Sequence, residues 1–428
     1  MNKDWIRKTI GELCKEGGGK VQTGPFGSQL HQTDYSEEGT PVIMPTDIST
    51  GQIDISRIAR VSDAHVHRLS RHKLRKGDIV YGRRGDIGRQ ALVRQSSVGW
   101  LCGTGCLKIR LGNSEVDPEY LHRYLKLPEI IGWIEGQAIG ATMPNLNTEI
   151  LNRVPVCYPG RGEQRKIAAI LTAYDDLIET NKRRIALLEK MAEEIYREWF
   201  VRMRFPGHQD TIFVKGVPAG WEVRPLASLC QEVRKGVRKK DLADDEIYIG
   251  LEHIPRKSIA LRDWSTADSV ESNKLRFKKG DILFCKIRPY LHKVALAHFD
   301  GACSSDTIVL RPRNTVYEGF LLFTIFSETF IDLATIAATG TRMPRADWAF
   351  LEKLELKIPH PQLLQIYQSR FDEIISLIEN LLQINQQALE TRDLLLPRLI
   401  SGKLSVADLD IQFPPSMRDD IDAPNHRE

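Results

Sequence analysis

The stretch EQRKIAAILTAYDDLIETNKRRIALLEKMAEEIYREWF occupies residues 163–200 and contains neither proline nor glycine. Its apolar side chains recur at alternating spacings of three and four residues, from Ile167 to Trp199. This spacing predicts a long helix with one continuous apolar face. At 1.5 Å per residue the helix would be about 57 Å long, and its apolar face requires a partner of similar length.

A second stretch, LLQIYQSRFDEIISLIENLLQINQQALETRDLLL at residues 363–396, repeats the same spacing and supplies that partner. Each stretch carries one asparagine on its apolar face, Asn181 and Asn385, and a buried asparagine fixes register because its amide must find a polar group. We therefore predict that the two helices pair, with two unrelated helices as the alternative. The side chains expected to pack between the helices or against a partner are Ile178, Asn181, Ile185, Leu188, Ile195, Trp199, Ile378, Leu381, Asn385, Leu395 and Leu399.

The chain also repeats itself at a shift of about 200 residues, which is the signature of a duplicated architecture. HKLRKGDIVYGRRGDIGRQALV at 72–93 matches NKLRFKKGDILFCKIRPYLHKVALA at 273–297, and Met143-Pro144 matches Met343-Pro344. In the first half, strands are expected at 79–81, 90–94 and 107–111. The repeat predicts an α+β fold in which two mixed α/β domains each precede a long helix, and the two helices form an antiparallel coiled coil.

The repeat and the proline and glycine positions set the predicted boundaries. Pro397 and Gly402 are read as stop signals for the second helix, and the acidic, proline-bearing end of the chain is expected to be a flexible tail. The predicted parts are a first domain (1–159), a first spacer helix (160–204), a second domain (205–360), a second spacer helix (361–404) and the tail (405–428).

Composition indicates a soluble cytoplasmic protein with no membrane segment. The seven cysteines have irregular spacing and predict no disulfide framework. The N-terminus lacks the apolar core of a signal peptide, and the apolar run at Phe320–Phe326 is too short to span a membrane. The net charge of +4 is compatible with a nucleic-acid partner without requiring one.

No segment matches a catalytic signature. GGGK at 17–20 and SGKLS at 401–405 lack the full spacing of a phosphate-binding loop. Cys102 and Cys106 have no second pair of ligands with zinc-site spacing. We therefore predict a chain without catalytic, cofactor-binding or metal-binding residues.

Basic side chains cluster at corresponding places in the two halves, after the Lys-Gly-Asp turns and around the Met-Pro turns. Lysine and arginine neutralise phosphates, whereas arginine and asparagine also read base edges in the major groove. We favour DNA contact over the alternative of solvated charged loops. The candidate DNA contacts are Arg83, Arg84, Arg89 and Asn145 in the first half, and Lys235, Arg238, Lys239, Lys240, Lys286, Arg288, Tyr290, Lys293, Arg342 and Arg345 in the second.

Several segments in this order carry a family resemblance. EEIYREWFVRMRFPG (193–207) and LLPRLISGKL (395–404) close the two helices, and the repeated KGDI turns lie within the domains. TGPFGSQL (23–30) lies near the start of the first domain, and GWEVRPLASL (220–229) opens the second. With these segments the chain resembles the specificity (S) subunits of Type I restriction–modification systems, and Ser28 of TGPFGSQL joins the candidate DNA contacts.

The resemblance implies that each domain is a target-recognition domain that reads one half of a bipartite, asymmetric site in double-stranded DNA. It implies that the two helices act as a spacer and bind two methyltransferase (M) subunits, which restriction (R) motor-nuclease subunits then join. S-adenosylmethionine, ATP and Mg²⁺ would belong to those partners and not to this chain. The second helix begins PHPQLLQIY instead of repeating EQRKIAAIL, so unequal M-subunit docking faces are expected.

Two other classes of protein are considered, a stand-alone sequence-specific DNA-binding regulator and a coiled-coil scaffold. Met191, Tyr196, Trp199 and Phe200 exceed what one two-helix contact needs, so we interpret them as apolar surface for partner subunits, which disfavours the regulator. A scaffold would not need duplicated domains with matching basic loops. A nuclease or methyltransferase is disfavoured by the missing motifs.

Overall fold

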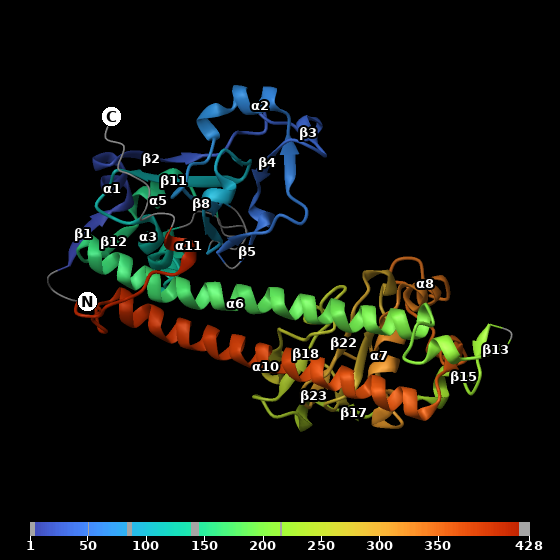
Figure 1. Cartoon of the computed structure of the whole chain (residues 1–428). Helices are drawn as coiled ribbons and strands as arrows, with labels where there is room; N and C mark the ends of the chain where they lie inside the picture. The colour runs from blue at the N-terminus through green and yellow to red at the C-terminus, as the bar shows by residue number, and fades with distance from the viewer. Residues whose placement is uncertain (1–4, 50, 84–87, 138–144, 215, 419–428) are drawn as a thin grey trace. The chain divides into compact units, whose positions relative to one another are not determined.

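The computed structural model of the protein describes residues 5–49, 51–83, 88–137, 145–214 and 216–418. The chain folds into two compact units. Unit 1 comprises residues 1–177 and 388–428, and unit 2 comprises residues 178–387. Each unit holds one globular domain and parts of two long helices, α6 (Arg161–Tyr196) and α10 (Pro361–Ile400) (Figure 1). The predicted alternation of domain and long helix is confirmed.

The core of unit 1 is built on a four-stranded antiparallel sheet whose central strands are β-branched, aromatic and buried. The strands predicted at 79–81, 90–94 and 107–111 all belong to it. In order across the sheet they are β2 (Gly18–Thr23), β11 (Cys106–Gly112), β8 (Ile79–Gly82) and β9 (Gln90–Leu92). A second sheet, with one parallel pair, consists of β10 (Leu101–Cys102), β4 (Thr40–Ile43), β7 (Ala59–Val61) and β3 (Tyr35–Ser36).

Strand β1 (Ile6–Thr9) pairs with β12 (Pro155–Tyr158), so the two ends of the first domain meet next to the start of α6 (Figure 1). Thr9 then caps the following helix reciprocally with Glu12, whose carboxylate accepts the Thr9 backbone N–H at 2.7 Å. The remaining elements of this domain are α1 (Ile10–Glu16), β5 (Ile48–Ser49), β6 (Gln52–Ile53), α2 (Asp63–Arg68), α3 (Pro118–Tyr124), α4 (Pro128–Gln137) and α5 (Thr148–Arg153).

Unit 2 repeats this plan. Its four-stranded antiparallel sheet has the order β16 (Cys230–Glu232), β24 (Thr307–Pro312), β21 (Ile282–Cys285) and β22 (Val294–Leu296). Its second sheet has five strands, β17 (Gly236–Val237), β20 (Lys274–Phe277), β23 (Gly301–Cys303), β18 (Ile247–Ile249) and β19 (Ser265–Thr266). The ends of the domain again meet, because β15 (Glu222–Pro225) pairs with β25 (Glu355–Ile358). A short hairpin of β13 (Phe213–Val214) and β14 (Val217–Pro218) precedes β15.

The helices of the second domain are α7 (Glu318–Phe326), α8 (Glu328–Ile336) and α9 (Trp348–Leu351). Within the described residues, no single helix is both long and apolar enough to cross a membrane. By length and composition alone, one bent pair of segments, Thr315–Phe326 with Glu328–Ile336 at 59°, meets that criterion.

The repeated Lys-Gly-Asp turn is a structural device that appears once in each unit. Asp78 and Asp281 are almost fully buried, and each forms a bidentate pair with an arginine, Arg110 or Arg311. Each carboxylate also accepts a backbone N–H of its own turn, at 2.9 Å from Arg75 and at 2.8 Å from Lys278. Pairing and hydrogen bonding offset the cost of burying a carboxylate, so the turn holds the start of β8 and β21 in place.

The two long helices pack antiparallel in both units, as predicted. In unit 2 the Asn181 amide Nδ2 donates to Asn385 Oδ1 at 3.0 Å, and the Trp199 and Tyr367 rings are 5.7 Å apart. In unit 1 the Arg392 guanidinium donates to Asp175 at 2.7 Å, and Ile167 shares a buried cluster with Leu399. The side chains predicted to pack between the helices are buried or half-buried: Ile178, Asn181, Ile185, Leu188, Ile195, Trp199, Ile378, Leu381, Asn385, Leu395 and Leu399.

Two expectations about the helix ends are wrong. Pro397 does not stop α10, which continues to Ile400 before Gly402 adopts a left-handed conformation with φ +70°. Tyr196 and Phe200 are buried in the core of the second domain, where the Phe200 ring lies 5.0 Å from the Phe320 ring. These aromatics therefore anchor the end of α6 to its own domain and do not form a surface for partner subunits.

The prediction of a flexible tail is also wrong for residues 405–418. The Lys166 ammonium donates to the Ala407 carbonyl at 2.6 Å, and the Ser416 hydroxyl donates to Asp176 at 2.6 Å. A short helix, α11 (Pro415–Arg418), buries Met417 against the outer side of α6. The tail is held because its scattered apolar side chains find a complementary helix face within the same unit.

We predict that the asparagine pair sets the register of the helices, and that breaking the pair lowers the free energy of unfolding. Asn385→Ala leaves the buried Asn181 amide without its partner, which should lower the free energy of unfolding by about 1–3 kcal/mol. The double variant Asn181→Leu with Asn385→Leu removes both polar groups and should be close to wild type or more stable. Urea unfolding of the wild type, of Asn385→Ala and of the double variant measures these free energies, with Asn380→Ala at an exposed position as the control. Equal effects of N385A and N380A would contradict the assignment.

We predict that the stability of the protein depends on the protonation of Glu318. Burial, and then the nearby Asp372 and Glu379 carboxylates, raise the pKa of Glu318 to about 7. Lys279 lowers this pKa by a smaller amount, and Asp281 raises it slightly. Between pH 4.5 and 7 the folded protein binds a proton on Glu318 that the unfolded chain releases. The free energy of unfolding contributed by this group therefore falls as pH rises through that window and is constant above it.

The variant Glu318→Gln should lack this decline, so the free energy of unfolding of the wild type, measured relative to the variant, should fall from pH 4.5 to 7. Chemical denaturation at several pH values measures this difference, and Asp332→Asn removes an exposed carboxylate of the same domain as the control. A difference that stays constant across the window would refute the assignment.

Candidate nucleic-acid interface

In unit 1 the structure joins the loop after β8 to the segment that follows residues 138–144. The Arg83 backbone carbonyl accepts the Leu146 N–H at 2.9 Å. The Arg83 guanidinium Nε donates to Asn145 Oδ1 at 3.0 Å and to the Leu146 carbonyl at 3.2 Å. Two candidates that are 62 residues apart in sequence are thus in direct contact. Arg89, just before β9, is exposed, and Arg84 lies outside the described residues.

Unit 2 makes the same connection with different side chains. The Lys286 carbonyl accepts the Ala346 N–H at 2.8 Å, and the Arg288 N–H donates to the Pro344 carbonyl at 2.7 Å. Asp306 lies between two of the candidates, 3.5 Å from the Lys286 ammonium and 3.4 Å from the Arg345 guanidinium. Arg83 in unit 1 and Lys286 in unit 2, the residues that follow β8 and β21, therefore make corresponding backbone contacts, with Leu146 and with Ala346.

The loop that presents Arg288 and Tyr290 has a strained and anchored backbone. Arg288 and His292 have φ values of +50° and +52°, a region that side chains other than glycine rarely adopt. The buried His292 ring hydrogen-bonds the Phe326 carbonyl through Nε2 at 2.7 Å, and burial lowers the pKa of this imidazole. The strain of about 1–3 kcal/mol per residue persists because these contacts hold the turn. Tyr290 is 54% exposed on it, and no sequence signal marks His292 as its anchor.

Lys293 has a partner within its own domain. Its ammonium donates to the Leu251 carbonyl, and burial lowers the pKa of the group. The structure therefore turns Lys293 toward a loop of its own domain, away from the exposed basic side chains. Lys293 directly precedes β22, and side chains along a strand alternate between its two faces. A shift of one residue is therefore enough to move a side chain from the exposed face to the face that lies against the domain.

A second basic surface in unit 2 follows β16, the first strand of the four-stranded sheet. Lys235, Arg238, Lys239 and Lys240 are all exposed there. Arg238 pairs with Asp241 at 2.8 Å, an exposed ion pair that contributes little to stability and can be exchanged for another anion. The corresponding segment of unit 1, after β2, exposes Ser28 and Phe26 without any basic residue. The two domains thus present unlike side chains at matching places.

Arg342 and Arg345 are exposed on the turn that follows α8. Among the residues that the structure describes, Lys239, Lys240 and Arg288 have no ion-pair partner. Each unit therefore carries cationic or amide side chains on loops held by regular backbone hydrogen bonds. Such groups can contact phosphates, and arginine or asparagine can also read base edges.

Polar anchors that the sequence did not reveal hold each domain to the long helices. In unit 1 the buried Arg123 of α3 pairs with Asp175 of α6, which also pairs with Arg392. Burial alone would raise the pKa of Asp175, but Arg123, Lys126 and Arg392 outweigh it and lower the pKa to about 2. In unit 2 one Glu189 oxygen accepts hydrogen bonds from Ser258, Ile259 and Ala260. A rigid attachment of this kind positions the loops on a fixed support.

The described residues contain no group of three or more histidine, cysteine, aspartate or glutamate side chains that could hold a metal ion. Cys102 and Cys106 are buried, and burial raises the pKa of the Cys102 thiol to about 12. Neutral thiols of this kind are poor metal ligands.

Comparisons with known proteins agree with this geometry. The family described as "Type I restriction modification DNA specificity domain" matches residues 2–190 and 218–391, which is most of the chain. The chain is 25% identical over 429 residues to the Type I restriction enzyme MjaIX specificity subunit of Methanocaldococcus jannaschii, covering 95% of both proteins. It is 21% identical over 434 residues to the HindI specificity subunit of Haemophilus influenzae, covering 83% of this chain and 94% of that protein.

A solved structure has the same fold. The S subunit of the Type I restriction–modification system from M. genitalium superimposes with a TM-score of 0.55 at 16% sequence identity. The match covers 93% of this chain and 97% of that one. The tandem arrangement of two mixed α/β domains and two long helices is therefore an architecture that is already known.

Proposed function

The chain belongs to the Type I restriction–modification DNA specificity family, and from that premise we propose that it is the non-catalytic subunit that reads a bipartite, asymmetric DNA site. The observation that carries the proposal is the duplication of one domain plan with unlike side chains on matching loops. Arg83 with Asn145 in unit 1 corresponds to Lys286 with Arg345 in unit 2. Two copies of one domain give two half-sites, and unlike loops make the half-sites different.

Within each domain we assign the loops after β8 and β21, together with the turns that contact them, to the DNA. The Arg83 fork and the Asn145 amide can bind guanine and adenine edges, and exposed lysines can bind phosphates. Lys235, Arg238, Lys239 and Lys240 extend the second surface. Most of these groups act on the backbone, because most protein–DNA hydrogen bonds go to phosphate and sugar.

We further propose that the long helices bind methyltransferase subunits through apolar side chains that the two-helix packing leaves exposed. On α10, Ile366, Leu377 and Ile384 are 50%, 51% and 42% exposed. They are spaced eleven and seven residues apart, or about three and two helical turns, and so lie on one face. Leu187 and Met191 are exposed on α6 one turn apart. Surface of this kind indicates a protein partner.

In this arrangement methyl transfer and DNA cleavage are performed by the methyltransferase and restriction subunits. We place S-adenosylmethionine, ATP and Mg²⁺ in those partners. The proposal for this chain is limited to recognition and assembly.

The experiment that tests the proposal is a domain exchange within the assembled methyltransferase. Replacement of residues 1–159 by the matching domain of a relative should change one half-site of the methylated sequence and leave the other intact, because the domains read independently. Mapping of methylated adenines in host DNA measures both half-sites at once, and exchange of residues 205–360 is the reciprocal control. A change in both half-sites from one exchange would contradict independent reading.

A second prediction concerns Lys286 and Arg345, which share Asp306. The double variant Lys286→Ala with Arg345→Ala should weaken binding of the assembled complex through the second half-site only. If a side chain binds phosphate, its removal should reduce the salt slope of log affinity by about 0.9. If it reads a base, its removal should instead cost about 1–3 kcal/mol at one base pair.

Binding to cognate and single-substituted duplexes at several salt concentrations separates these effects. Lys293→Ala is the matched control, because its ammonium is bound to the Leu251 carbonyl. Unchanged affinity, salt slope and base preference in the double variant would show that this loop faces solvent in the complex.

A further inference from the structure

The second Met-Pro turn, residues 339–345, is closed at its base by two backbone hydrogen bonds. The Thr339 N–H donates to the Arg345 carbonyl at 3.0 Å, and the Arg345 N–H donates to the Thr339 carbonyl at 2.9 Å. Gly340, at φ +104°, adopts a conformation that other residues rarely reach and so allows the chain to reverse here. All residues from Thr339 to Met343 are exposed, so the tip of the turn faces solvent.

The returning side of this turn is held by the strained loop after β21. The Arg288 N–H donates to the Pro344 carbonyl at 2.7 Å, and the Ala346 N–H donates to the Lys286 carbonyl at 2.8 Å. Arg288 itself has a φ of +50°. Pro344 is half-buried, and its ring fixes its own φ. The second Met-Pro turn is therefore firmly supported by its domain and loses little conformational freedom when it binds a ligand.

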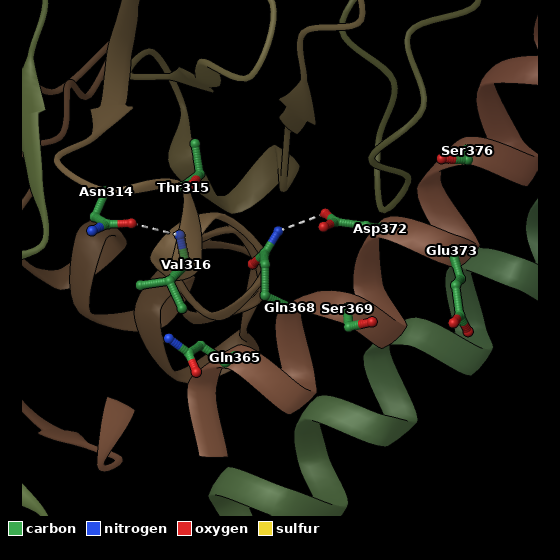
Figure 2. Close-up of a pocket in the computed structure, with 9 residues that line it drawn as sticks. All are labelled: Asn314, Thr315, Val316, Gln365, Gln368, Ser369, Asp372, Glu373 and Ser376. Atoms are coloured by element: carbon green, nitrogen blue, oxygen red, sulfur yellow. Dashed lines mark hydrogen bonds between the residues drawn. The ribbon is translucent and has the colours of Figure 1, made fainter. Parts of the chain in front are cut away.

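A groove and this turn present opposite kinds of side chain on the second domain. The groove, of about 730 Å³ between α10 and residues 314–316, is lined by Val316 and otherwise by polar side chains (Figure 2). On the turn, Met343 is 46% exposed, with the exposed Arg342 before it and the exposed Arg345 two residues after it. Water can satisfy the polar groove by hydrogen bonding, whereas an apolar side chain gains from removal from water.

The sequence repeat divides the residues of this turn into two kinds. GATMPNLN at 140–147 corresponds to GTRMPRAD at 340–347, and both contain Met-Pro. The register is fixed by the helices that follow, because Asn147 and Asp347 cap α5 and α9 through their side chains. Residues 138–144 lie outside the described part of the chain, so the correspondence there is one of sequence. The residues beside the Met-Pro pair differ, being Thr142 and Asn145 in the first half and Arg342 and Arg345 in the second.

This division indicates two different roles. Side chains that read unlike half-sites have to differ between the halves, whereas a side chain that acts on base stacking can be the same in both. Stacking is open to one apolar side chain at any sequence, because every base pair has two flat faces. Methionine is unbranched and polarisable, and it is among the side chains that enter between base pairs as wedges and kink the duplex.

We propose that Met343 is a wedge that inserts between two adjacent base pairs of the second half-site and unstacks them, while Arg342 and Arg345 neutralise phosphates beside the opened step. The inference rests on the proposed DNA recognition and adds a deformation of the duplex to it. The cost of opening a step depends on its sequence and is smallest at pyrimidine–purine steps. Met343 thereby contributes to specificity without a hydrogen bond to a base.

The test uses the chain assembled with methyltransferase subunits, at saturating concentration, on duplexes of the sequence found by methylation mapping. 2-Aminopurine replaces one adenine at a time, or pyrrolocytosine one cytosine at a time, in and beside the second half-site, with the methylated adenines left unlabelled. Both probes brighten when their neighbour is unstacked, and the wild type should raise the fluorescence about threefold or more at one step. Met343→Ala should abolish this rise, whereas Met343→Leu should retain it because leucine has a similar volume.

The salt dependence of binding separates the wedge from the arginines. Met343→Ala should lower affinity about tenfold and leave the salt slope of log affinity unchanged, because it removes no cation. Arg342→Ala should instead reduce that slope by about 0.9. Val223→Ala removes apolar surface at an exposed position on β15 and is the control, which should change neither fluorescence nor affinity.

Two results would overturn the wedge: no rise in fluorescence at any probed position with the wild type, or a rise that Met343→Ala leaves intact. In both cases specific binding to the mapped sequence would leave the recognition proposal standing. A complex that does not prefer the mapped sequence to other DNA would instead refute the recognition proposal, and the wedge with it.

Discussion

The buried hydrogen bond between the Asn181 and Asn385 amides is the constraint on which the rest of the structure depends. Apolar seams with regular spacing can slide by one heptad at little cost, whereas a buried amide has one position in which it is satisfied. With the asparagines opposite each other, Trp199 meets Tyr367 in unit 2 and Asp175 meets Arg392 in unit 1. The ion pair between Asp175 and Arg392, which crosses the two helices, depends on this register.

Each domain is divided between a fixed frame and variable loops. The buried Asp–Arg pairs of the Lys-Gly-Asp turns are alike in both units, as are the orders of the four-stranded sheets. The loops that leave these strands differ, with Arg83 and Asn145 in one unit and Lys286 and Arg345 in the other. Because the frame is stabilised by its own buried pairs, the loop side chains can change without loss of the fold. This separation supports the proposal that the two domains read different half-sites.

The sequence predicted the frame well and the surroundings of single side chains poorly. Helical spacing identified both long helices, and the repeat identified the two domains of matching plan, but it did not reveal the contact between Lys286 and Ala346. Periodicity shows that a side chain faces something apolar but does not identify the partner, so Tyr196 and Phe200 were assigned to a partner protein although they pack on Phe320. The charge of Lys293 likewise carries no information about which carbonyl lies beside it, and its contact with DNA stays a prediction.

The tail was predicted to be flexible because its composition is that of a disordered segment. Whether it is ordered depends instead on a helix face that is more than 200 residues away in sequence. Among the described residues of the tail, the apolar side chains in this contact are Ile411, Phe413 and Met417, which are too few to form a core of their own. They are sufficient because Ala168 and Ala169 leave a shallow groove in a helix that is already ordered, so only the tail loses conformational freedom.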